Sequence, residues 1–228
     1  MRPNTISDNP AAFPPDSETI WEYAERHTSP EDPLLQELVR YTHLHVMNPR
    51  MLPGHIQGKL LEQIACMIRP QAILEIGTYT GYSAICLAKG LAADGRLHSI
   101  ERNDELYAAT HSFISRSPYA DKITLHTGDA REIIPTLPGR FDLLYIDGDK
   151  REYCDYYRMA FDKVRPGGFM LADNVLWDGK VVDAVASGEG RTRGIAAFNA
   201  LVQADPRVEN VLLPFCDGLM MVRKRETD

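Results

Sequence analysis

From residue 72 onward, short apolar runs alternate with longer segments whose apolar residues recur every three or four positions. The short runs predict buried strands, and the periodic segments predict amphipathic helices. We expect strands at 72–76, 96–100, 123–127, 141–146 and 169–172, and helices at 81–91, 104–115, 130–137, 153–164 and 195–204. Strands that alternate with helices through short connections predict a parallel sheet covered by helices on both faces.

The two ends of the chain depart from this alternation. Periodic segments predict helices at 17–27, 33–45 and 56–68, before the first strand. Apolar runs at 208–213 and 219–223 flank a turn-forming segment and predict a hairpin-like pair. We therefore predict one α/β domain over residues 17–228, with a Rossmann-like, doubly wound, mostly parallel seven-stranded sheet, a terminal antiparallel strand and extra N-terminal helices. Residues 1–16, rich in proline and polar residues, are expected to form a disordered arm.

Composition narrows the class of protein. The chain has 228 residues, 44% hydrophobic and 25% charged, which is ordinary for a soluble domain, and no apolar run approaches the roughly 20 residues of a membrane span. A formal net charge of −7 disfavours broad nucleic-acid binding without excluding a local basic patch. The N-terminus has no apolar signal core, so we expect a cytoplasmic protein. The cysteines form no Cys-x-x-Cys pair, and Cys66 and Cys86 fall in apolar helical patterns that predict buried thiols.

The segment 73–83 is the most informative part of the chain. An apolar run meets an acidic residue, turns on Gly77 and Gly81, and enters a helix. Such a strand-to-helix corner presents backbone N–H groups and a helix N-terminus to a nucleotide-type ligand. The glycine spacing is not the Gly-x-Gly-x-x-Gly of dinucleotide sites, and no Gly-x-x-x-x-Gly-Lys-Ser/Thr phosphate loop occurs. The pattern therefore disfavours a dehydrogenase.

Acidic residues lie at the ends of four of the predicted parallel strands, namely Glu75, Glu101, Asp129 and Asp147. Ligands of open parallel sheets bind beyond the carboxyl ends of the strands. A carboxylate at Glu101 can accept both ribose hydroxyl protons of a nucleoside. Helix capping explains Asp129 in part, but it explains neither Glu75 nor Glu101.

Two further motifs predict a metal site. The predicted strand at 141–146 ends in Asp147, and the one at 169–172 is followed by Asp173 and Asn174. Adjacent strands would bring two carboxylates and an amide carbonyl together. Such an all-oxygen cluster suits Mg²⁺, or alternatively Mn²⁺ or Ca²⁺, and without a cation the carboxylates would repel each other.

These motifs together resemble those of the cation-dependent class I O-methyltransferases related to caffeoyl-coenzyme A and catechol O-methyltransferases. The resemblance covers about 34–223 and is carried by Glu75-Ile76-Gly77-Thr78-Tyr79-Thr80-Gly81-Tyr82-Ser83, by Asp147-Gly148-Asp149-Lys150 and by Asp173-Asn174. It implies S-adenosyl-L-methionine (SAM) as methyl donor, a divalent cation, a small catechol-like or hydroxycinnamoyl acceptor, and a homodimer.

The resemblance also implies roles for single residues. Ribose is expected on Glu101, adenine beside Asp129 and Ala130, the methionine end beside Gly77, Ser83 and Asp147, and further cofactor contacts at Glu75, Tyr79 and Met51. The segment at Met51 matches only loosely and could equally be a structural loop.

Lys150 lies three residues after Asp147, as the proposed general base does in the catechol enzyme. A nearby dication would lower the pKa of its amine, so that the amine could accept a phenolic proton. The alternative interpretation is a surface lysine at the start of a helix. Trp177 matches an acceptor-ring position and could also be a core residue. Arg191 and Arg193, in a segment expected to be flexible, could grip an anionic tail of the acceptor or be solvated.

Two alternative functions would also involve SAM binding. Some relatives methylate a hydroxylated uridine in transfer RNA, against which the net acidity of this chain argues. A non-catalytic SAM-binding protein would not need the intact metal ligands or Lys150.

Overall fold

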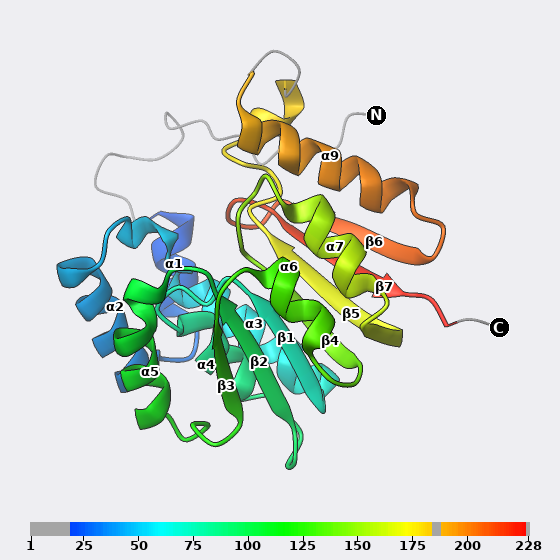
Figure 1. Ribbon diagram of the computed structural model, residues 1–228. Helices are drawn as coiled ribbons and strands as arrows, with labels where there is room; N and C mark the ends of the chain where they lie inside the picture. Colours follow the sequence, from blue (N-terminus) through cyan, green and yellow to red (C-terminus); the bar gives the residue numbers. More distant parts are fainter. Residues whose placement is uncertain (1–18, 184–187, 227–228) are drawn as a thin grey trace. The chain divides into compact units, whose positions relative to one another are not determined.

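The computed structural model describes residues 19–183 and 188–226 (Figure 1). Contacts divide the chain into two compact units, Met1–Pro30 and Glu31–Asp228. In the first, α1 (Ile20–Arg26) begins with a capping box between Thr19 and Glu22. The predicted arm at 1–16 lies outside the described residues, and a single domain over 17–228 stays a prediction. None of the described helices is long and apolar enough to cross a membrane.

The second unit is built on a seven-stranded sheet in the order β3-β2-β1-β4-β5-β7-β6. Its strands are β1 (Ala72–Ile76), β2 (Arg96–Glu101), β3 (Ile123–Thr127), β4 (Phe141–Ile146), β5 (Val164–Asp173), β6 (Val208–Leu213) and β7 (Leu219–Lys224). The first five pair in parallel, and β7 pairs antiparallel with both β5 and β6. The predicted fold class is confirmed, and the last strand of the chain inserts between its two partners.

Helices cover both faces of this sheet because neighbouring strand residues point to opposite sides. On β1, Ile73 packs in one apolar cluster and Leu74 in the other. The first cluster includes α2 (Pro33–His45), α3 (His55–Ile68), α4 (Tyr82–Ala88) and α5 (Tyr107–Arg116). The second includes α6 (Ala130–Ile133), α7 (Tyr153–Phe161) and α9 (Gly190–Ala204), of which α6 and α7 lie in front of the sheet in Figure 1. Short 3₁₀ turns are η2 (Pro49–Met51), η3 (Asp104–Leu106), η4 (Ile134–Thr136) and η5 (Lys180–Asp183).

Several boundaries differ from the sequence prediction. β5 begins at Val164, five residues before the predicted start, because its Pro-Gly-Gly segment is accommodated by a register shift against β4 and by a positive φ of 73° at Gly167. α9 begins at Gly190, so the described part of the segment before Ile195 is largely helical. Cys86 is buried as predicted, but Cys66 is exposed, because it lies on the outward side of α3.

The contact between α3 and the end of α4 depends on Gly90. A Cβ atom built there would lie 2.2 Å from the carbonyl carbon of Ala65. Backbone atoms cannot yield as a flexible side chain can, so a larger residue must separate the two helices. α3 and the segment after α4 therefore pack closely at this point.

We expect Gly90→Ala to lower the free energy of unfolding by about 2 kcal/mol because of this overpacking. Urea unfolding of the two proteins measures the difference. The matched control is Gly190→Ala, where the nearest atom would be Arg151 Cδ at 3.8 Å and no loss is expected. Equal stabilities of the Gly90 and Gly190 variants would contradict the interpretation.

Candidate active site

The predicted site residues lie in a row along the carboxyl edge of the sheet. The strand order places Asp129 after β3, Glu101 at the end of β2, Glu75 near the end of β1, Asp147 after β4 and Asp173 at the end of β5. The edge where parallel strands end is the usual ligand-binding edge of such sheets. The fold thus brings to one edge side chains that are distant in the sequence, such as Glu75 and Asp173, which are 98 positions apart.

The corner after β1 needs its glycine. Gly77 has φ +98°, and an added Cβ would lie 2.3 Å from the carbonyl oxygen of Asp147. Asp147 in turn donates its backbone N–H to Ile76 O at 2.8 Å. The corner and the start of the β4 loop are therefore one rigid piece, and any side chain at Gly77 would push them apart.

Glu101 is organised by the same corner. Its Oε2 accepts the N–H of Tyr79 at 2.6 Å, and its Oε1 accepts the N–H of Asn103 at 2.8 Å. Burial raises the pKa of the Glu101 carboxyl. The Tyr79 hydroxyl donates to Met47 O at 2.9 Å, which ties the segment before η2 to this corner. A carboxylate has room for further acceptor contacts beyond these two.

Glu75 is fully buried, and its two oxygens differ. Ser99 Oγ donates to Oε2, whereas Oε1 has no hydrogen-bond partner among the described residues. Burial raises the pKa of this carboxyl to about 7, and Ser83 is one of the neighbours that oppose the shift. An unpaired buried oxygen beside the glycine corner is suited to a donor group of a bound ligand.

Asp129 is less available than the sequence suggested. It caps α6 by accepting the N–H of Arg131 at 2.9 Å, and it also pairs with the guanidinium, with Arg131 Nη2 2.6 Å from Oδ2. Hydrogen bonding to Arg131 lowers the pKa of the Asp129 carboxyl to about 2. The adjacent Ala130 is buried at the start of α6. The Asp129 carboxylate is thus engaged within the protein.

Lys150 is a buried residue with 8% of its surface exposed, so the alternative of a surface lysine is wrong. Its Nζ donates to Asp147 Oδ1 at 2.6 Å and to the Tyr153 hydroxyl at 2.6 Å. The Tyr153 hydroxyl donates onward to the carbonyl oxygen of Asp173 at 3.0 Å. These bonds fix the amine between the ends of β4 and β5.

Asp173 is held by residues distant in sequence. Gln57 Nε2 on α3 and the Tyr145 hydroxyl on β4 both donate to Oδ2, at 2.5 and 3.2 Å, and Asn174 N donates to Oδ1 at 2.7 Å. Burial first, and then the charge of Asp147, raise the pKa of the Asp173 carboxyl. Asn174 has φ +56°, a left-handed conformation that Asn tolerates better than most residues.

The donor set of Asp147, Asp173 and Asn174 fits a hard divalent cation. The two aspartates follow register partners Ile146 and Ala172, so they are neighbours across the sheet. Among the described residues, no group of three or more His, Cys, Asp and Glu could hold a metal, so a cation here would depend on two carboxylates and the Asn174 amide. Oxygen donors of this kind suit Mg²⁺, and a cation would offset the repulsion that acts on Asp173.

The predicted acceptor residues Trp177, Arg191 and Arg193, and the predicted cofactor residue Met51, have no contact with Asp147 or Asp173 among the described residues. Trp177 is half-buried with φ +50°, and its Nε1 has no hydrogen-bond partner among the described residues. Met51 ends η2 and is exposed. Arg193, in the first turn of α9, donates to Gly188 O just before the helix, and Arg191 lies in the same turn. Neither arginine is joined to Asp147 or Asp173 by a contact in the part of the chain that the structure describes.

Sequence reasoning missed four residues of this site. Gln57, Tyr145 and Tyr153 hold Asp173 and Lys150, as described above. Gly194 lets α9 lie against the Lys150 turn, because an added Cβ would be 2.4 Å from Lys150 O. The only local signal was a polar Gln57 among the apolar positions of a helix, and nothing local names its partner.

Glu75 gives the site a pH-dependent effect on stability. Its folded pKa of about 7 exceeds the ordinary 4.5, so between these values the folded protein holds a proton that the unfolded chain has lost. The free energy of unfolding must therefore fall as pH rises through this window. We expect Glu75→Gln to remove this fall, gaining about 3 kcal/mol relative to wild type between pH 4.5 and 8.

Urea unfolding of both proteins at a series of pH values measures this difference. Glu25→Gln, on a separate helix and exposed, is the control for loss of one negative charge. Parallel pH profiles for wild type and Glu75→Gln would show that the carboxyl ionises normally in the folded state.

Comparison with known proteins assigns this chain to a protein family. The family model described as O-methyltransferase matches residues 25–225. A catechol O-methyltransferase from Niastella koreensis is 37% identical over 161 residues, covering 69% of this chain and 72% of that protein. A caffeoyl-CoA O-methyltransferase from Eucalyptus gunnii is 31% identical over 220 residues, covering 91% of this chain and 88% of that protein.

Solved structures agree over most of the chain. The O-methyltransferase from Bacillus cereus, in complex with SAH, superposes with a TM-score of 0.85 at 30% identity, covering 90% of this chain and 96% of that one. TomG from Streptomyces achromogenes, in complex with SAM, gives a TM-score of 0.84 at 27% identity, covering 89% and 94%. The chain therefore belongs to the O-methyltransferase family and is a SAM-dependent O-methyltransferase of the caffeoyl-CoA and catechol type.

Proposed function

We propose that this enzyme requires a divalent cation and methylates a hydroxyl of a small catechol-like or hydroxycinnamoyl acceptor. The observation that carries the proposal is the pair of adjacent carboxylates, Asp147 and Asp173, with Lys150 Nζ 2.6 Å from Asp147 Oδ1. The relatives named catechol and caffeoyl-CoA O-methyltransferases support the class of acceptor.

The cofactor would lie along the row of strand ends. Glu101 is proposed to hold the ribose, and the unpaired Oε1 of buried Glu75 supports a polar contact to the ligand at the glycine corner. Ser83 stands in the first turn of α4, where the helix N-terminus adds N–H donors. The proposed cofactor contacts are Met51, Glu75, Gly77, Tyr79, Ser83, Glu101, Asp129, Ala130 and Asp147.

The chemistry is a displacement at the methyl carbon. Asp147, Asp173 and Asn174 would hold the cation, which supplies charge that lowers the pKa of an acceptor hydroxyl. Lys150, as the neutral amine, is proposed to take the hydroxyl proton on Nζ. The acceptor oxygen then forms a bond to the methyl carbon while the bond from that carbon to sulfur breaks, leaving SAH. Asp147 and Tyr153 keep Nζ oriented through this step.

The acceptor would be bounded by Trp177, with Arg191 and Arg193 on α9 available to an anionic tail. We further propose a cytoplasmic homodimer with one catalytic domain over 17–228. No contact of the described residues favours transfer RNA as acceptor, so a hydroxylated uridine is an outcome of the acceptor screen and not a second proposal. The buried Lys150 beside two carboxylates speaks against a non-catalytic SAM binder.

Metal removal tests the first part of the proposal. Methyl transfer from labelled SAM to 3,4-dihydroxyphenyl acceptors should stop with excess EDTA and return with Mg²⁺, because the two aspartates need a cation to bind and activate the acceptor. The matched acceptor is the same ring with one hydroxyl absent, which should react far less. Transfer that persists in EDTA would overturn the metal requirement, and transfer only to transfer RNA would overturn the acceptor class.

Lys150→Met tests the base. We expect kcat to fall by about 10²- to 10⁴-fold, the usual contribution of a general base, while the Kd for SAM stays within a few-fold. Lys122→Met, at the amino end of β3, controls for loss of a positive charge. Equal losses of turnover and SAM affinity would sink the assignment.

A further inference from the structure

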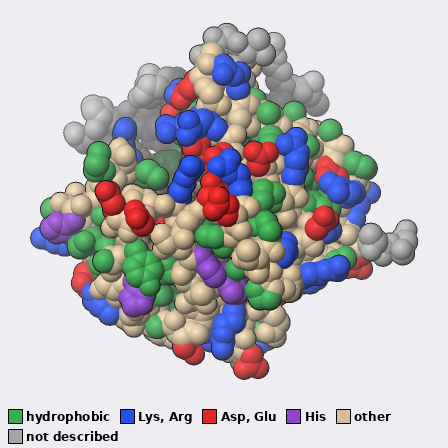
Figure 2. Space-filling model, viewed as in Figure 1, with side chains coloured by type: hydrophobic (Ala, Val, Ile, Leu, Met, Phe, Trp, Pro, Cys, Tyr) green, Lys and Arg blue, Asp and Glu red, His purple; other side chains and the backbone are tan. Residues whose placement is uncertain are grey.

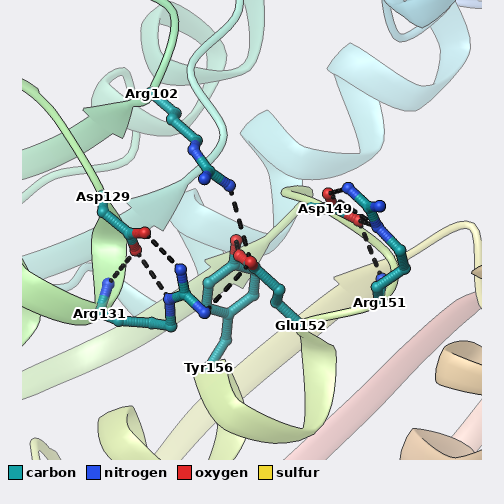
Figure 3. Close-up of polar contacts among 7 residues, drawn as sticks. All are labelled: Arg102, Asp129, Arg131, Asp149, Arg151, Glu152 and Tyr156. Atoms are coloured by element: carbon teal, nitrogen blue, oxygen red, sulfur yellow. Dashed lines mark hydrogen bonds and ion pairs between the residues drawn. The ribbon is translucent and has the colours of Figure 1, made fainter.

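A cluster of alternating charges joins the loops next to the proposed adenosine contacts. Its centre is Glu152, at the start of α7, whose side chain is 16% exposed. Glu152 Oε1 lies 3.3 Å from Arg131 Nη1 and 3.6 Å from Arg102 Nη1, and Oε2 accepts the Tyr156 hydroxyl at 2.7 Å. Figure 3 shows the carboxylate between the two arginines, with the Asp149–Arg151 pair off to one side.

The cluster extends through Arg131 to Asp129. The Nε and Nη2 atoms of Arg131 lie 3.0 and 2.6 Å from the two oxygens of Asp129, while its Nη1 faces Glu152. One guanidinium thus bridges two carboxylates from different loops. Bidentate pairing of this kind fixes orientation as well as distance.

The members of the cluster are sequence neighbours of the proposed cofactor contacts. Arg102 follows Glu101 at the end of β2, and Arg131 follows Ala130 at the start of α6, just after β3. Glu152 lies between β4 and α7, so its pairs with both arginines join the loops after β2 and β3 to the loop after β4. Figure 2 shows acidic and basic side chains gathered over α6 and the start of α7 on this face.

We propose that Glu152 is a positioning residue that holds the adenosine side of the SAM site in its binding geometry. It acts through Arg102 and Arg131, which set Glu101 and the Asp129–Ala130 turn. This inference rests on the proposed location of the cofactor and adds a residue that does not itself touch it.

The charge balance explains why one carboxylate is decisive. Two arginines and two acidic residues alternate along the cluster, so each like-charged pair is separated by an opposite charge. Without the Glu152 charge, Arg102 and Arg131 face each other across an uncharged group and repel. The rearrangement with the lowest free-energy cost is that the exposed Arg102 side chain turns into solvent. The backbone next to Glu101 is then less firmly held.

The test is Glu152→Gln, which preserves size and the acceptor for the Tyr156 hydroxyl. We expect the Kd of both SAM and SAH, measured by calorimetry without acceptor, to rise about tenfold. The KM for SAM should rise by the same factor while kcat at saturating SAM stays within about twofold. The matched control is Asp155→Asn on the same helix, whose exposed pair with Arg158 lies at 3.4 Å and should leave both constants unchanged.

The comparison of SAM with SAH separates positioning from long-range electrostatics. SAM carries a sulfonium charge that SAH lacks, so a general loss of negative potential would weaken SAM alone and overturn the proposal. Unchanged affinity for both ligands in Glu152→Gln would also overturn it and leave the proposed function standing. Wild-type protein that binds neither ligand would overturn the proposed function and the inference together.

A salt series supplies a second readout that a merely structural role would not change. The pairs of Arg102 and Arg131 with Glu152 are partly exposed, so added salt should screen them. Wild-type affinity for SAH should fall between low and high salt, and the Glu152→Gln affinity should change less. Parallel salt profiles would contradict the proposal.

Discussion

The crowding of carboxylates at the ends of adjacent parallel strands is the constraint on which the rest of this site depends. Parallel pairing puts Asp147 beside Asp173, with Glu75 and Glu101 on the next strands. Burial raises the pKa values of Glu75, Glu101 and Asp173, because a carboxylate away from water disfavours its charged form. The surrounding structure is arranged to offset that cost.

The negative charge of each carboxylate is stabilised by a different kind of hydrogen-bond donor. Asp147 accepts a hydrogen bond from Lys150 Nζ, and Asp173 has neutral donors from Gln57 and Tyr145. Glu101 has backbone N–H groups, which carry no counter-charge and leave the carboxylate able to accept more. The edge therefore has side-chain donors near the ends of β4 and β5 and backbone donors at the end of β2.

Rigidity at this edge comes from backbone contacts more than from side chains. The near contact of Gly77 with the Asp147 carbonyl and of Gly194 with the Lys150 carbonyl locks the β1 corner, the β4 loop and α9 to one another. Methyl transfer is sensitive to alignment of donor and acceptor, so a scaffold that fixes both sides of the reaction is suited to it. The ion pairs of Glu152 with Arg102 and Arg131 join the loops that follow β2, β3 and β4 in a similar way.

The sequence by itself determined the strands, the glycine corner and the acidic strand ends. These depend on local periodicity and on turn chemistry, which act over a few residues: the ranges of β1, β3, β4 and β6 match the prediction. Helix ends and β5 were predicted less well, because a bulge at Gly167 and the docking of α9 override local breaking signals. The site residues were found by their positions after strands, and their assembly at one edge follows from parallel pairing.

Only the tertiary structure decided which partners those residues have. Gln57 reaches Asp173 across 116 positions, and Glu152 meets Arg102 and Arg131 from three separate loops. It also showed that Asp129 is occupied by Arg131 and that Lys150 is buried. No local pattern encodes such pairings, because they arise when the packing of whole helices and strands brings side chains together and excludes water from them.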